Sequence, residues 1–144
     1  MSDTYSVHWL TDAQHAYWRS YIRQIADLLR LRDWDFILSR GQASDDALAG
    51  VRITYQTRSA VVSLSPQWMG LSREKQRECI AHEVIHAHLD VIDTHVWHVE
   101  KIEGGKSLGI LRELVKHDIE CATDTLSVMV AAFLPLPPTA EDEV

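Results

Sequence analysis

The hydrophobic positions of the first third of the chain predict one helix followed by a strand. Between residues 11 and 31 apolar side chains recur at every third or fourth position, which is typical of an amphipathic helix. Thr11 is a suitable N-cap for this helix, and Asp12 falls in its first turn. Residues 34–39 then form a short apolar and aromatic run, which indicates a strand.

The next segments predict a β-hairpin that follows a polar loop over residues 41–50. Apolar and polar side chains alternate over residues 51–57, and a second short apolar run follows over residues 58–65 after a tight turn. This arrangement is typical of two antiparallel strands. Together with the run over 34–39, it predicts a small sheet of three strands.

Two long helices are predicted in the second half of the chain. Ser72 is a suitable N-cap for a helix that reaches about residue 90. A second helix is predicted from about Ser107 to Leu134, where Pro135 ends it because proline cannot continue a helix.

The stretch between these helices and the C-terminal segment are predicted to be irregular. Residues 91–106 show no sustained helical period and contain two consecutive glycines, so we expect a long loop, with a short extended piece over 96–99. Residues 135–144 are proline-rich and acidic, and we expect them to be disordered. The sequence thus predicts one α+β domain over residues 1–134.

Composition narrows the classes of function. A chain of 144 residues with 46% hydrophobic and 24% charged residues is typical of one soluble globular domain. The net charge of −7 disfavours a nucleic-acid partner, and no apolar run approaches the ~20 residues that span a bilayer. Without a recognisable signal peptide we expect a cytoplasmic protein, with Cys79 and Cys121 reduced and buried. The sequence does not predict an oligomeric state.

The stretch AHEVIHAHL, residues 81–89, carries the spacing H-E-x-x-H at positions 82–86. Residues four apart lie on one face of a helix, so the imidazoles of His82 and His86 can converge on one zinc ion. Glu83 lies beside this pair and can act as the general base toward a zinc-bound water.

A catalytic zinc ion needs a third protein ligand, and the last predicted helix supplies the candidates. Asp90 continues the stripe of His82 and His86, but it lies ~12 Å from His82 along a straight helix, too far to share one ion. The last helix has a polar stripe without Lys or Arg, formed by Glu113, His117, Glu120 and Asp124. We expect this stripe to face the metal.

The pairing of H-E-x-x-H over 82–86 with E-x-x-x-D over 120–124 resembles the gluzincin metallopeptidases. The chain is also similar to small zincin-like proteins of phages and bacteria, including the SprT-like and ImmA-like groups. The resemblance covers roughly residues 15–132 and implies a zincin-like fold: an N-terminal helix, a small sheet, the H-E-x-x-H helix and a C-terminal glutamate helix.

The resemblance implies a role for each matching residue. His82, His86 and Glu120 would bind Zn²⁺, Glu83 would be the base, and Asp124 would hydrogen-bond a ligand histidine. The third histidine of metzincins would fall at Ile92, which excludes that subclass.

Two departures leave alternatives open. SprT-like proteins use a downstream histidine as third ligand, a part that His95 or His98 could take. Larger gluzincins stabilise the oxyanion with a His or Tyr from a further domain. In this chain we assign that catalytic role to His98 or His117, with His95 as another candidate.

The expected function is zinc-dependent hydrolysis of a peptide or protein substrate, with Glu83 activating the water. The substrate would bind extended along the edge of the sheet. One alternative is a zinc-binding regulatory or accessory protein with little or no peptidase activity, for example in a phage. Another is hydrolysis of a non-peptide amide.

Overall fold

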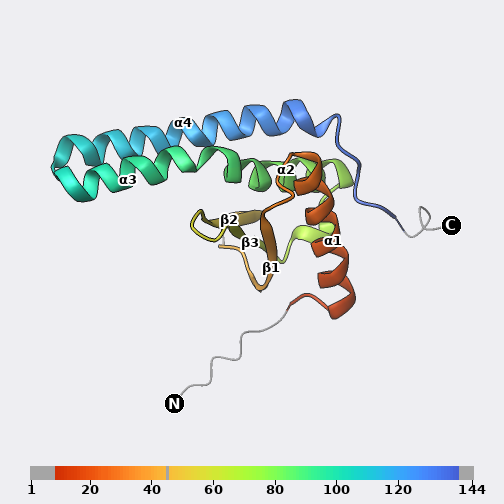
Figure 1. Cartoon of the computed structure of the whole chain (residues 1–144). Helices are drawn as coiled ribbons and strands as arrows, with labels where there is room; N and C mark the ends of the chain where they lie inside the picture. The colour runs from red at the N-terminus through yellow and green to blue at the C-terminus, as the bar shows by residue number, and fades with distance from the viewer. Residues whose placement is uncertain (1–8, 45, 140–144) are drawn as a thin grey trace, which may run out of the picture.

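The computed structural model describes residues 9–44 and 46–139 and has an α+β fold (Figure 1). Its elements follow one another as α1 (Asp12–Leu28), β1 (Asp35–Gln42), β2 (Ala49–Thr54), β3 (Ser59–Leu64), a 3₁₀ turn η1 (Trp68–Gly70), α2 (Arg73–Leu89), α3 (Val91–Glu103) and α4 (Lys106–Ala131). The predicted α+β class is therefore confirmed for the described part of the chain. No described helix is both long enough and apolar enough to cross a membrane.

The sheet is mixed, with the strand order β1-β3-β2. β2 and β3 form the predicted antiparallel hairpin, with Ala49 paired to Leu64 at one end and Thr54 paired to Ser59 at the other. β1 pairs with the far side of β3 in parallel. This order leaves β2 as an edge strand, and the sequence did not predict which strand would take that position.

The main core lies between the sheet and the first two helices. α1 packs on β1, and α2 packs on β2. Alternate side chains of β3, Ala60, Val62 and Leu64, are fully buried, as expected for a strand with one face covered. The same core holds Trp18 of α1 and Trp68 of η1, whose rings meet edge to face at 5.2 Å.

The start of α1 agrees with its prediction. The Thr11 hydroxyl accepts a hydrogen bond from the backbone of Gln14, and the Gln14 side chain accepts one from the backbone of Thr11. This reciprocal pair satisfies two backbone N–H groups that the first turn leaves free. The helix ends at Leu28 rather than near residue 31, and Arg30 follows with a left-handed φ of 68°.

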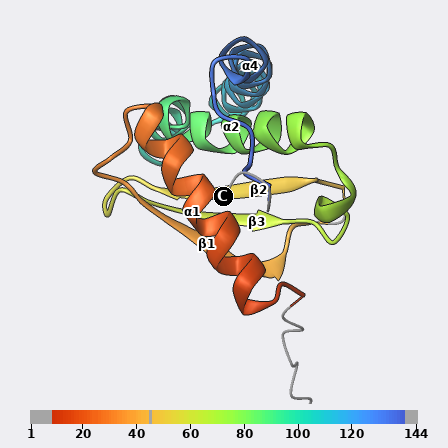
Figure 2. The same ribbon diagram turned by 90° about the vertical axis from the view of Figure 1, so that its right-hand side faces the viewer.

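α2 lies between the sheet and α4, as Figure 2 shows. It is therefore buried on more than one side and lacks a wide polar face. α4 packs on it mainly through small side chains, with Thr123, Ser127 and Ala131 buried. The helix that carries H-E-x-x-H thus has the core on one side and the glutamate helix on the other.

The prediction of a loop over 91–106 was wrong, because residues 91–103 form α3 and no extended piece is present over 96–99. α3 packs on α4, and the two helices form the arm at the left of Figure 1. On α3 the inward positions include Asp93 and Glu100, which form ion pairs of 3.5 and 3.8 Å with Arg112 of α4. Charged residues therefore occupy inward positions that are usually apolar. The hydrophobic period of a helix is for this reason not visible in the sequence of α3.

The segment after α4 also differs from the expected disorder. Residues 135–139 run extended over the helices, with Pro137 buried. Tyr21 of α1 donates a hydrogen bond to the Pro135 carbonyl at 2.8 Å, and Arg73 of α2 donates to the Pro137 carbonyl. The rest of the predicted tail, residues 140–144, lies outside the described residues.

Candidate metal centre

Three side chains from two helices meet at one point between α2 and α4. The His82 and His86 rings both present Nε2, and these two atoms lie 3.2 Å apart. From α4, the Glu120 carboxylate places one oxygen 3.0 Å from His86 Nε2 and the other 3.5 Å from His82 Nε2. The structure thus brings together the three residues expected to bind metal.

The spacing of these atoms fits a small metal ion. Zinc bonds of ~2.0–2.1 Å at tetrahedral angles separate neighbouring ligand atoms by ~3.3 Å. The 3.2 Å between the two Nε2 atoms and the 3.0 Å from His86 Nε2 to Glu120 Oε1 lie close to this value, and His82 Nε2 lies 3.5 Å from the other oxygen, Oε2. No other group of three or more His, Cys, Asp or Glu side chains within the described ranges could hold an ion.

A carboxylate fixes the orientation of each imidazole. Asp124, one turn after Glu120, lies 3.0 Å from His82 Nδ1, so the expected contact between Asp124 and a histidine of the motif is present. Asp90 lies 2.7 Å from His86 Nδ1. When each Nδ1–H donates to its carboxylate, each Nε2 keeps a free lone pair directed at Glu120. Metal-binding histidines commonly have this arrangement.

The role of Asp90 was missed at the sequence level. Distance correctly argued against Asp90 as a ligand, but its position one turn after His86 suits a hydrogen bond to that ring. The spacing of four between His86 and Asp90 was the available signal, matching the spacing of four between Glu120 and Asp124.

Burial and nearby charges shift the two histidines in opposite directions. The pKa of His82 is lowered by burial and by the neighbouring His86, which together outweigh Glu120 and Asp124. Burial also lowers the pKa of His86, but the hydrogen bond and charge of Asp90 outweigh it, and the net pKa is raised. The neutral form that a metal ligand requires is therefore easier to reach at His82.

Glu83 lies beside this cluster in a largely dry position. Only 8% of its surface is exposed, and burial raises its pKa to about 7 despite the opposing effect of His86. No hydrogen bond or ion pair to another described residue engages its carboxylate. A carboxylate with a raised pKa and no fixed partner is suited to accept and return a proton near neutral pH.

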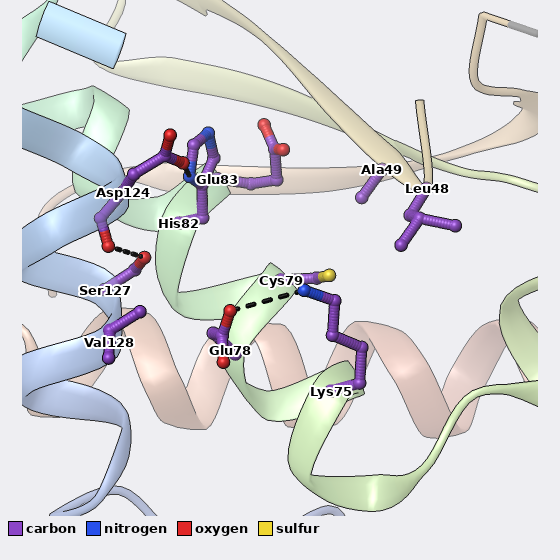
Figure 3. Close-up of a pocket in the computed structure, with 10 residues that line it drawn as sticks. All are labelled: Leu48, Ala49, Lys75, Glu78, Cys79, His82, Glu83, Asp124, Ser127 and Val128. Carbon is purple, nitrogen blue, oxygen red and sulfur yellow. Dashed lines mark hydrogen bonds and ion pairs between the residues drawn. The ribbon is translucent and has the colours of Figure 1, made fainter. Parts of the chain in front are cut away.

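Two cavities adjoin along β2 and share Ala49, His82 and Glu83. One cavity, of about 280 Å³, extends toward Cys79 and Val128 (Figure 3). The other, of about 450 Å³, is lined by the edge strand, by both motif histidines and by Asp90 and Glu120. Figure 3 shows the Glu83 side chain between His82 and the edge strand. His82, His86, Glu120 and Glu83 therefore open onto a groove bounded by β2.

The other histidines named from the sequence do not line these two cavities. His98 lies on α3 in a separate cavity with Trp97 and Arg112, and its ring meets Trp97 at 5.1 Å. His117 is exposed on α4, 3.6 Å from the Cys121 sulfur. His95 is exposed on α3. The Glu113 carboxylate lies 3.8 Å from the Lys116 ammonium group.

Comparison of this chain with protein-family models, with curated proteins and with solved structures gives no match. The functional argument therefore rests on the geometry of the site and on the chemistry of its residues.

Proposed function

We propose that the protein is a zinc-dependent peptidase of the zincin type, with His82, His86 and Glu120 as the metal ligands. The observation that carries this proposal is the convergence of three electron-pair donors, two Nε2 atoms and a carboxylate, within 3.5 Å of one another. When both rings are neutral and both Nδ1–H groups are donated to Asp90 and Asp124, the two Nε2 lone pairs and the Glu120 carboxylate repel one another. A bound cation removes this repulsion.

Each residue at the site then has a distinct task. His82, His86 and Glu120 would hold the zinc ion, which would supply a Lewis acid for the substrate carbonyl and lower the pKa of a bound water. The Glu83 carboxylate accepts the proton of the attacking water and returns it to the leaving amine. Because Glu83 is buried, its proton affinity is set by the site rather than by bulk solvent. Asp90 and Asp124 hold the imidazoles in the required tautomer.

The substrate in this proposal is an extended peptide segment beside β2. β2 is an edge strand whose residues 49–51 line the cavity that contains Glu83. The free backbone groups of an edge strand can pair with an added strand, which would align a peptide bond along the groove.

Metal analysis tests the site. Protein purified without chelator and dialysed should retain near-stoichiometric zinc by plasma mass spectrometry, and His86→Ala should lose it. Iron must be measured alongside, because two histidines and one carboxylate also hold non-haem Fe²⁺. His95→Ala is the matched control. His95 is exposed on α3, and it would be the third ligand if the site resembled that of SprT-like proteins. Zinc retained in His86→Ala, or lost in His95→Ala, would contradict the assigned ligand set.

Activity is tested separately on a broad peptide library. The zinc-loaded protein should cleave a subset of the peptides, and cleavage should stop on chelation and return when zinc is restored. Cleavage that continues unchanged in a chelator would exclude a metal-dependent reaction.

One observation favours a second function, a zinc-binding accessory protein with little hydrolysis. Apart from the two motif histidines, the side chains lining the cavity at Glu120 include no hydrogen-bond donor, neither Lys, Arg, Tyr nor an amide. An oxyanion donor typically contributes a factor of ~100–1,000 in rate. Full zinc occupancy without cleavage of any library peptide would support this second function.

A further inference from the structure

α4 has an apolar surface on the side turned away from the rest of the molecule. The residues on its packed side recur every fourth position and include Val115, Ile119, Thr123, Ser127 and Ala131. In Figures 1 and 2 no other described element covers the opposite side. We call that side the outer face. Its exposed large apolar side chains are Ile110, Leu111, Leu114, Val128 and Met129, and the exposed Phe133 follows just after the helix.

The degree of exposure is unusual for such side chains. Leu114 is 57% exposed, Val128 59% and Phe133 89%. Single exposed apolar residues are common, but two groups of them on one helix face, Ile110 to Leu114 and Val128 to Met129, form an interrupted stripe that indicates an interaction surface. From Ile110 to Met129 the stripe runs ~28 Å at 1.5 Å per residue.

We propose that the outer face binds the outer face of a second copy of this chain, with the two α4 helices antiparallel and Cys121 at the two-fold axis. Cys121, expected from the sequence to be buried, is exposed at the middle of the stripe. In a two-fold interface each residue before the axis meets a residue of the second copy that lies about the same distance after the axis and on the same flank.

The sizes of the side chains fit this pairing. Ile110 and Leu114 lie eleven and seven residues before Cys121, and Ala132 and Val128 lie eleven and seven residues after it. In the antiparallel pair Ile110 therefore faces Ala132 of the second copy, and Leu114 faces Val128. A larger side chain meets a smaller one at each step, as ridges-into-grooves packing requires.

The charges fit the same pairing. At about 100° per residue, Asp118 and Thr125 lie on one flank of the outer face and His117 on the other, next to Asp124, which is 71% exposed at the border with α2 and has one oxygen 3.0 Å from His82 Nδ1. Two-fold symmetry brings like flanks together, so His117 meets Asp124 of the second copy, and Asp118 meets the neutral Thr125. In a parallel pair in register, Asp118 would lie next to Asp118 of the second copy and Asp124 next to Asp124. The repulsion between these like charges is unfavourable. Charge therefore selects the antiparallel arrangement.

The outer face offers little to an anionic partner. After residue 108, α4 has one arginine, Arg112, and one lysine, Lys116, and neither lies on the outer face. Arg112 is engaged with Asp93 and Glu100, and Lys116 lies 3.8 Å from Glu113. An apolar surface of matching pattern is the partner that the face fits, and a second copy supplies it.

Sedimentation velocity over a range of concentrations tests the association. We expect reversible dimers, and Leu114→Glu should weaken dimerisation at least tenfold without changing the circular dichroism spectrum. The matched control is Ile102→Glu, which makes the same kind of change at an exposed position of α3, where Ile102 is 80% exposed. A monomer at every concentration, or equal dissociation of both variants, would overturn the proposal.

Cross-linking tests the register. In a Cys79→Ala background, mild oxidation should link Cys121 to Cys121. In a Cys79→Ala/Cys121→Ala background, Leu114→Cys together with Val128→Cys should also form disulfide-linked dimers. Leu114→Cys alone should not, because the two copies of residue 114 lie ~21 Å apart along the antiparallel helices. Efficient linkage of Leu114→Cys alone would mean a parallel pair and overturn this arrangement.

Discussion

At the residue scale, each histidine of the motif directs Nε2 at the proposed metal position and Nδ1 at a carboxylate. Asp90 contacts His86 within α2, whereas Asp124 reaches His82 from α4. Each contact fixes the tautomer that leaves Nε2 free, so both aspartates affect metal affinity without belonging to the ligand set.

We predict that Asp90→Asn and Asp124→Asn each lower zinc affinity by ~10–100-fold while the fold is kept. The amide retains the size of the side chain but removes the negative charge that holds the Nδ1–H. Competition with a chromophoric chelator measures the affinity. Glu113→Gln on α4 is the control, because it also removes one acidic charge but its nearest charged partner is Lys116. An equal loss in Glu113→Gln would show that overall charge, not orientation, sets the affinity.

Glu83→Gln should keep zinc and the fold but reduce hydrolysis by a factor of ~100–10,000. Gln is nearly isosteric with Glu and cannot accept a proton from water, so only the base is removed. Initial rates on a library peptide that the wild type cleaves give the measurement, with zinc content determined on the same samples. Wild-type rates in this variant would show that Glu83 is not the base.

The motif residues were predictable because a spacing of four on one helix fixes their geometry locally. Glu120 and Asp124 were predictable only as members of a stripe, and the family resemblance selected them from it. The positions of His98 and His117 relative to the groove depend on how α3 and α4 cross α2, and this crossing is a tertiary property that no local pattern contains.

At the element scale, the sequence predicted features that depend on neighbouring residues in the chain. It did not predict features that depend on packing between distant segments. The Thr11 cap and the β2–β3 hairpin are local and were predicted. α3 was missed because Asp93 and Glu100 face Arg112 across a helix pair. The parallel pairing of β1 with β3 was also missed, since it joins strands separated by a third strand in the chain.

The turn between α3 and α4 provides an element-scale prediction. Gly105 has φ 105° and ψ 157°, a conformation that is essentially restricted to glycine. No atom lies within 4 Å of a Cβ built there, so Gly105→Ala should lower the free energy of unfolding by ~1–3 kcal/mol through backbone strain alone.

Gly109→Ala is the matched control for this turn. Gly109 lies inside α4, and a Cβ there also meets no atom within 4 Å. Alanine is favoured over glycine in a helix by up to ~1 kcal/mol, so this variant should be more stable than the wild type. Urea denaturation of both variants gives the comparison, and equal stabilities would contradict the backbone argument.

At the scale of the whole molecule, α4 packs on α2 and α3 and lies outside the main core. The main core is built from α1, the strands, η1, α2 and Leu134, and the buried side chains of α4 itself lie outside it. The buried side chains of α4 are Ile119 and three small ones, Thr123, Ser127 and Ala131, whereas Ile110, Leu111, Leu114, Val128 and Met129 are exposed. The proposed metal ligands come from two helices in contact, with two histidines on α2 and Glu120 on α4.

We predict that removing the metal loosens α4 while the sheet and α1 stay unchanged. Without a cation, the repelling donors of His82, His86 and Glu120 oppose the packing of α4, so local opening of this helix costs less free energy. Hydrogen–deuterium exchange should show faster uptake across residues 115–131 after chelation and no change in β3 or α1. Both arms need the same protein concentration, so that self-association is equal. Glu120→Ala should match the chelated wild type and no longer respond to zinc, because α4 has lost its ligand. Uptake in α4 that is identical with and without zinc, in protein shown to bind it, would mean that the ion does not join the two helices.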